Sequence, residues 1–188
     1  MRIEGSTVLF EAEEGLAVAS NGTVAIDLRT GAIQSEDDES EVGSSTALLC
    51  HEAFEMDGTS ASSAHWSQNG CGAVDLLIAN SSDTQEVPCI AQVARTQEIG
   101  PESNWGSAHP EGEAGSLLMN QLGTPNETVH DGNWEDGDTA YLGFRMRDDA
   151  GQTLYGWAEV AITADGITLR RFAYDRSGSA IRAGSAAA

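Results

Sequence analysis

Lysine is absent from this sequence. All nine basic residues are arginines, and they face 30 aspartates and glutamates in a chain of 188 residues, which gives a formal net charge of −21 at pH 7. Such a charge repels phosphate backbones and anionic membrane surfaces, so it disfavours nucleic acid as a partner and favours divalent cations. An acid-rich, lysine-free composition is also typical of proteins in sea water or brine, where salt screens the self-repulsion. Base bias in the genome and a simple need for solubility are the alternative explanations.

Long apolar runs are also missing. No stretch of 18 apolar residues occurs, so no membrane insertion is expected. Residues 1–5 lack the apolar segment of a signal peptide, so export requires either a leader already removed or a route not visible in the sequence. Because 40% of the residues are hydrophobic, we expect one continuous core and a single domain over residues 1–188.

Helical periodicity is nearly absent, whereas strand patterns recur along the chain. We therefore expect an all-β fold, a single antiparallel β-sandwich or jelly roll of about ten strands with long acidic loops. The expected strands span residues 7–12, 16–19, 23–28, 46–50, 73–79, 87–95, 140–147, 153–163, 167–174 and 180–182. The expected loops span residues 34–45, 52–70 and 96–116, and residues 117–122 suit one or two helical turns. A hairpin turn with positive φ is expected at Asn21, and a four-residue hairpin loop at residues 148–151.

The clearest strand pattern lies in residues 140–184, a C-terminal hairpin cassette. Residues 140–147 alternate between an apolar face and a face with one tyrosine and two arginines, whereas residues 153–163 carry large side chains on both faces, as a central strand does. In the next strand, Ile167 and Leu169 are out of phase with Phe172 and Tyr174. Burying both pairs together therefore requires a β-bulge near residues 170–171.

Four short motifs in this cassette resemble a known family. They are YLGFR at 141–145, YGWA at 155–158, AY at 173–174 and IRAG at 181–184. Their spacing is similar to that in the C-terminal region of secreted bacterial proteins sorted by the PEP-CTERM system, over about residues 133–184. The resemblance implies an exported β-rich domain at or beyond the cell surface. Most such proteins have unknown functions, so it supplies no catalytic residues, and residues 185–188 lack the sorting signal that would imply an anchor.

The Cys-x-x-Cys spacing of zinc sites is missing too. The three cysteines are Cys50, Cys71 and Cys89. Our leading prediction is a Cys50–Cys71 disulfide, which would clamp the polar segment between two apolar runs and add about 3 kcal/mol of stability. Cys89 would then be left over or would pair between subunits. The alternative is three buried, reduced cysteines that act as small hydrophobes.

Calcium is the cofactor that the sequence favours. The segment at 131–138 places oxygen donors at alternate positions, the ligand type that calcium prefers. The candidate ligands are Asp131, Asn133, Glu135, Asp136 and Asp138. The pattern is not an EF-hand, because Asp136 occupies the glycine position and Leu142 the position of the bidentate acid.

Recognisable catalytic motifs are absent. The four histidines are dispersed through predicted loops without paired spacing, and no Gly-x-Ser-x-Gly elbow occurs. The sequons at Asn21, Asn80 and Asn126 matter only if the source glycosylates asparagine. Three tryptophans in predicted loops could stack on sugar rings, although a loop tryptophan more often plugs an end of a sandwich. These are Trp66, Trp105 and Trp134.

These observations favour a non-enzymatic structural protein of the extracellular space, such as a surface-layer, matrix or filament subunit in a saline environment. Its expected partner is another copy, reached through the chain termini or sheet edges, most simply by residues 7–12 adding to a neighbour's sheet. A calcium-dependent carbohydrate-binding module with a glycan partner is the alternative. A hydrolase with a site assembled from loops is the third possibility.

Overall fold

The protein is all-β. This computed structural model describes residues 1–34, 45–56, 59–67, 74–77, 90–106, 115–124, 127–132, 134–163 and 165–185. Those residues contain no helix and form fifteen strands, with antiparallel pairing throughout. The expected all-β fold is confirmed, although the strands outnumber the ten expected. Within the same ranges, no helix is long and apolar enough to cross a membrane.

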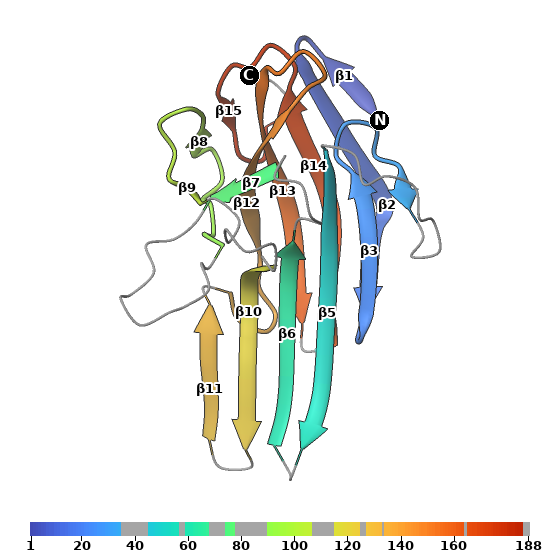
Figure 1. Ribbon diagram of the computed structural model, residues 1–188, viewed down its shortest axis with the longest axis vertical. Helices are drawn as coiled ribbons and strands as arrows, with labels where there is room; N and C mark the ends of the chain where they lie inside the picture. Colours follow the sequence, from blue (N-terminus) through green and yellow to red (C-terminus); the bar gives the residue numbers. More distant parts are fainter. Residues whose placement is uncertain are drawn as a thin grey trace.

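Two large sheets and one small one make up the fold (Figure 1). In order, the seven-stranded sheet contains β1 (Arg2–Glu4), β2 (Thr7–Ala19), β14 (Gly166–Asp175), β13 (Thr153–Thr163), β12 (Thr139–Arg147), β7 (Val74–Leu77) and β9 (Trp105–Gly106). The six-stranded sheet contains β11 (Glu127–Gly132), β10 (Gly115–Thr124), β6 (Thr59–Ser67), β5 (Thr46–Met56), β3 (Gly22–Asp27) and β4 (Ile33–Gln34). The small sheet pairs β15 (Ile181–Arg182) with β8 (Glu98–Ile99).

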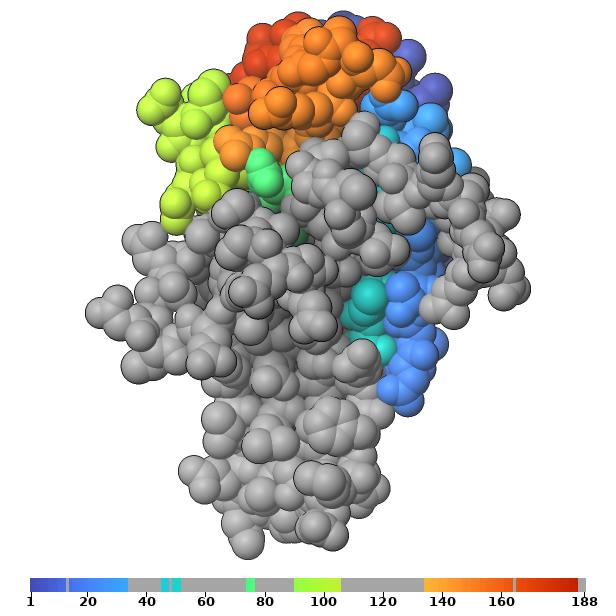
Figure 2. Space-filling view, viewed as in Figure 1, coloured from blue at the N-terminus to red at the C-terminus, as the bar shows by residue number. Residues whose placement is uncertain are grey.

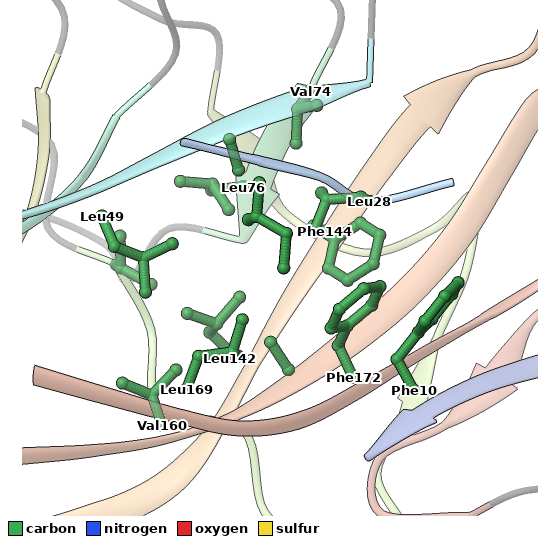
Figure 3. Close-up of a cluster of buried hydrophobic side chains, with 14 of the residues drawn as sticks. Phe10, Leu28, Leu49, Val74, Leu76, Leu142, Phe144, Val160, Leu169 and Phe172 are labelled. Carbon is green, nitrogen blue, oxygen red and sulfur yellow. The ribbon is translucent and has the colours of Figure 1, made fainter. Parts of the chain in front are cut away.

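The main core lies where the inner faces of the two large sheets meet. Alternation along β12 directs Leu142, Phe144 and Met146 inward, and Ile26 and Leu49 of the six-stranded sheet belong to the same buried cluster. Figure 3 shows aromatic rings from three strands in this cluster. Those of Phe10 and Phe172 are stacked, with centroids 4.5 Å apart.

A second cluster covers the outer face of the seven-stranded sheet. Tyr155, Trp157 and Ala173 project there from β13 and β14, and Ile99 and Ile181 of the small sheet pack over them. Strand β13 is thus buried on both faces, as its sequence predicted. Because side chains of the cassette take part in both clusters, its strands form the centre of the molecule.

The predicted bulge in β14 is confirmed. Leu169 pairs with Val160 and Arg171 with Glu159, so Arg170 is the extra residue. The phase change lets residues on both sides of the bulge, from Ile167 to Tyr174, share the main core. Strand β2 opposite is more irregular, because four of its residues, 12–15, lie opposite Arg170 alone.

The turn predictions are confirmed in part. The loop after β12 closes as expected, since the Asp148 N–H donates to the Gln152 carbonyl and Gly151 has φ +80°. Asn21 has the expected positive φ of 60°. Its turn nevertheless connects β2 to β3, which belong to different sheets, so it is not a hairpin within one sheet.

Three segments were assigned wrongly from the sequence. Much of residues 52–70, expected to be a loop, lies in strands β5 and β6, and the expected loop at 96–116 contains β8, β9 and the start of β10. The helical turns expected at 117–122 are part of strand β10. The expected strand at 87–95 contributes single-residue bridges at 90 and 93, of which Val93 pairs with Tyr141. Strands β1, β4, β6, β8, β9 and β11 were not predicted.

Candidate functional site

Exposed apolar side chains gather on one side of the molecule. Among the described residues, the large hydrophobics with exposed side chains are Met1 (77%), Ile3 (50%) and Ile33 (59%). Ile3 lies on β1 and Ile33 on β4, which are the end strands of the two large sheets. Since the Asn21 turn joins β2 to β3, these two ends lie on the same side, on the right in Figure 1 and among the blue segments on the right in Figure 2. We call this surface, formed by residues 1–4 and 33–34, the β1/β4 edge.

Strand β1 forms a tight hairpin with β2. Ile3 is paired with Val8 and Glu4 with Thr7, so the turn contains only Gly5 and Ser6. Gly5 has φ +61°, which glycine adopts without steric cost. Within the described residues β1 has no strand on its other side, so no described strand pairs with the backbone groups there.

A buried carboxylate fixes this hairpin to the sheet. Asp175, at the end of β14, has no exposed surface. Its carboxylate accepts hydrogen bonds from Ser6 Oγ at 2.5 Å and from the Ser177 N–H at 2.7 Å, as well as from Ser177 Oγ. Burial by itself raises the pKa of Asp175, but these hydrogen bonds to the ionised form outweigh it, and the pKa lies below its ordinary value.

A second carboxylate orders the turn that leads to β4. Asp27 accepts hydrogen bonds from Ser45 Oγ at 2.6 Å, the Arg29 N–H at 2.9 Å and the Thr30 hydroxyl at 2.8 Å. Burial opposes its ionisation, yet the hydrogen bonds again hold the pKa of Asp27 below its usual value. Each end strand of the β1/β4 edge is therefore positioned by one partly or fully buried aspartate.

The same turn packs directly on β2. A Cβ atom at Gly31, which has φ +73°, would lie 2.4 Å from the Phe10 ring, so a side chain there would displace the ring. The Tyr174 hydroxyl donates to the Arg29 carbonyl at 3.1 Å. The turn that leads to β4 therefore contacts two residues of the main core, Phe10 and Tyr174.

A cluster of polar side chains surrounds Arg171 on the outer face of the seven-stranded sheet. Its Nε donates to Glu159 at 2.6 Å, its Nη2 to the Tyr141 hydroxyl at 3.3 Å, and its guanidinium lies 5.5 Å from the centre of the Trp157 ring. Glu11 lies 3.7 Å from the same guanidinium. With so many protein partners, this arginine is suited to fixing strands together more than to binding a ligand.

Strained backbone occurs at Thr96, which has φ +71°. For a β-branched residue this left-handed conformation is an outlier. It is held in place by the small sheet, because the Thr96 N–H donates to the Ala183 carbonyl at 2.9 Å and the Ala183 N–H to the Gln97 carbonyl at 2.9 Å. The strained residue therefore lies where the segments of the small sheet, which covers Trp157, are hydrogen-bonded to each other.

Replacing Thr96 with glycine tests whether the backbone at this position is strained. We expect Thr96→Gly to raise the free energy of unfolding by about 0.5–1 kcal/mol, because glycine adopts positive φ freely but loses more entropy on folding. Chemical denaturation would measure the change. Thr139→Gly, at an exposed strand position with ordinary φ, should lower stability by about 1 kcal/mol. A decrease in both variants would contradict the assignment of strain.

His51 is buried in the six-stranded sheet with no exposed surface, and not in a loop as predicted. Neither ring nitrogen makes a hydrogen bond of normal geometry within the described residues. Burial lowers the pKa of His51, while the Thr163 backbone and the Asp165 carboxylate partly oppose this. Burial therefore favours the neutral form of the ring.

The predicted calcium ligands do not form one loop. Asp131 lies in β11, paired with Asn120, and Asn133 lies outside the described residues. Asp138 closes a local turn by accepting from the Glu135 N–H at 2.8 Å, and it also accepts from Gln92 Nε2 at 2.6 Å. Across the ranges that the structure describes, no three metal-binding side chains gather. A calcium site here remains a prediction.

The three tryptophans have different environments. Trp134 is 1% exposed and its indole N–H donates to the Ile90 carbonyl, so its assignment as a sugar platform is corrected to a core position. Trp105 is half-buried, 5.0 Å from the Arg145 guanidinium and in tilted contact with Tyr155. The side chain of Trp66 lies outside the described residues. Stacking on a glycan therefore remains a prediction for Trp66 and Trp105 alone.

The predicted disulfide and sequons fall largely on residues that the structure does not describe. Cys50 is a half-buried thiol on β5, and Cys71 and Cys89 lie outside the described ranges, so their pairing remains a prediction. Asn21 lies in the exposed β2–β3 turn, and Asn80 and Asn126 are also outside those ranges. Sequence reasoning missed the β1/β4 edge, for which the only signal was one isoleucine between charges before Gly-Ser.

Comparisons with known proteins give no further assignment. No family model matches the chain, and neither a curated protein nor a solved structure does. The resemblance to PEP-CTERM-sorted proteins therefore depends only on the motifs of the C-terminal cassette.

Proposed function

We propose that this protein is a non-enzymatic structural protein of the extracellular space that self-associates through the β1/β4 edge. The observation that carries this proposal is the grouping of Met1, Ile3 and Ile33. Exposed apolar side chains scattered singly are normal, but here they share one side, and among the described residues no strand pairs with the outer edge of β1, which carries Ile3. The resemblance to secreted bacterial proteins supports an extracellular location.

The proposed contact differs from the one expected from the sequence. Residues 7–12 were expected to add to a neighbour's sheet, but in the structure they belong to β2 and are already paired with β14. Strand β1 lies outside them and is the end of the sheet. The contact is therefore assigned to β1, on the side of the molecule where β4 also lies.

The charge of the chain determines when such a contact can form. Two copies with a net charge of −21 each repel one another in dilute buffer. In brine this repulsion is short-ranged, because the Debye length falls from about 10 Å at 0.1 M salt to about 3 Å at 1 M. Self-association should accordingly strengthen with salt, as expected of a protein from a saline environment.

Light scattering coupled to size-exclusion chromatography tests the proposal. We expect the mass to rise above the 19.7 kDa of one chain as protein concentration increases, and more steeply at about 1 M than at about 0.1 M NaCl. The double variant Ile3→Thr/Ile33→Thr should lose this rise, whereas Thr139→Asn, at an exposed position of central strand β12, should retain it. A mass of one chain at all concentrations in both salts would refute the proposal.

A further inference from the structure

The sequence of β1 is complementary to itself. Its three residues are Arg2, Ile3 and Glu4, and all three are exposed. If two copies of β1 lie antiparallel with Ile3 opposite Ile3, each Arg2 faces the Glu4 of the other copy. Charged side chains are one of the devices by which edge strands avoid pairing with a second copy. Here the opposite signs at positions 2 and 4 attract one.

The backbone of β1 fits the same register. In a two-residue turn, the carbonyl of the residue before the turn accepts from the N–H of the residue after it, which makes Glu4 and Thr7 a hydrogen-bonded pair. Pairs alternate along an antiparallel ladder, so Ile3 and Val8 form a non-hydrogen-bonded pair. The N–H and C=O of Ile3 therefore point away from β2, toward the open edge. Two Ile3 residues facing each other can exchange both hydrogen bonds.

We propose that two copies of this chain pair through β1 in antiparallel fashion, about a twofold axis at Ile3, joining their seven-stranded sheets into one continuous sheet. This inference rests on the proposed self-association and specifies its geometry. Within one chain, Arg2 Nε already lies 2.9 Å from Glu4 Oε1. In the dimer, the Arg2–Glu4 pair of one copy lies against the same pair of the other copy, so the four side chains form a ring of alternating charges. Since the same surface is used on both copies, the contact closes as a dimer and does not propagate as a fibre.

Reversal of single charges tests this register. Arg2→Glu places glutamates opposite each other at both symmetric positions, and Glu4→Arg places arginines there. Each single variant should weaken self-association about tenfold, since two exposed attractions become two repulsions. The two variants change the net charge in opposite directions, so a loss in both cannot come from general repulsion between acidic chains.

Two further samples should restore dimerisation. The double variant Arg2→Glu/Glu4→Arg keeps the net charge and is again self-complementary, so it should dimerise as the unmodified chain does. An equimolar mixture of the two single variants should form mixed dimers, identified by mass in native mass spectrometry, with few dimers of either variant alone. Sedimentation velocity over a concentration series, at one fixed salt concentration, would measure the affinities.

The outcomes separate the inference from the proposed function. If the unmodified chain self-associates but the single variants do so equally well, the β1 register is wrong while self-association stands. If the unmodified chain forms species larger than a dimer through this contact, the twofold arrangement is wrong. A chain that is monomeric under all conditions removes both proposals.

Discussion

Replacing Trp157 with alanine is expected to lower the free energy of unfolding by about 3–5 kcal/mol. The indole has no exposed surface, and it lies on β13 beneath the layer that covers the outer face of the sheet. It makes an edge contact with Tyr141 at 5.5 Å, supports the Arg171 guanidinium, and donates from its ring N–H to the Ser185 carbonyl at 3.0 Å. Truncation leaves a cavity and removes all three interactions together.

Measuring which residues lose protection distinguishes loosening of the covering layer from destabilisation of the whole protein. Amide hydrogen exchange in Trp157→Ala should increase most in residues 179–185 and around β8, because the covering layer loses the ring against which it packs. Trp157→Phe keeps much of the apolar contact and should cost less than the alanine variant. A loss below about 1 kcal/mol for Trp157→Ala in chemical denaturation would show that the covering layer contributes little.

Replacing Asp175 with asparagine is expected to cost about 2–3 kcal/mol at pH 7. The amide keeps the size of the side chain but has one acceptor oxygen where the carboxylate has two, and its NH₂ group faces hydroxyl and amide donors from Ser6 and Ser177. Asp149→Asn is the matched control. The Asp149 side chain is 85% exposed and forms an ion pair with Arg29 at 2.6 Å, so its effect should stay within about 0.5 kcal/mol.

The pH dependence gives this prediction a second readout. The folded pKa of Asp175 is lower than its value in the unfolded chain, so the carboxylate contributes its full stability above the unfolded pKa of about 3.9 and loses it as the pH falls through the folded value. The difference between the unmodified chain and Asp175→Asn should therefore shrink below pH 4. A constant difference from pH 7 to pH 2 would contradict the role of the charge.

The strands of the C-terminal cassette could be predicted because their side chains alone define two faces. Alternation in β12 and large residues on both faces of β13 gave correct bounds within one residue, and the phase change in β14 required the bulge at Arg170. In each case the pattern of side chains extends over nine or more residues, the full lengths of β12, β13 and β14. Such a pattern is long enough to exclude a helix.

The errors lie where local sequence carries no such period. Residues 59–67 are mostly serine and alanine, which suggested a loop, but β6 lies between β5 and β10 and is hydrogen-bonded on both sides. Residues 117–122 contain Leu-Leu-Met-Asn-Gln-Leu, which favours a helical turn, yet pairing with β6 and β11 imposes a strand. Hydrogen bonds between strands depend on partners distant in the sequence, which local propensity does not report.

By itself, the sequence determined the fold class, the central position of the cassette and the strongly acidic character of the protein. Alternation and composition are properties of single segments, so they need no knowledge of the fold. Only the tertiary structure decided that Trp134 belongs to the core, that Asp27 and Asp175 anchor the end strands, and that Ile3 and Ile33 share one side. The physical reason is that burial and sheet edges arise from the packing of distant segments. A three-residue strand such as β1 has no recognisable period until its neighbours are in place.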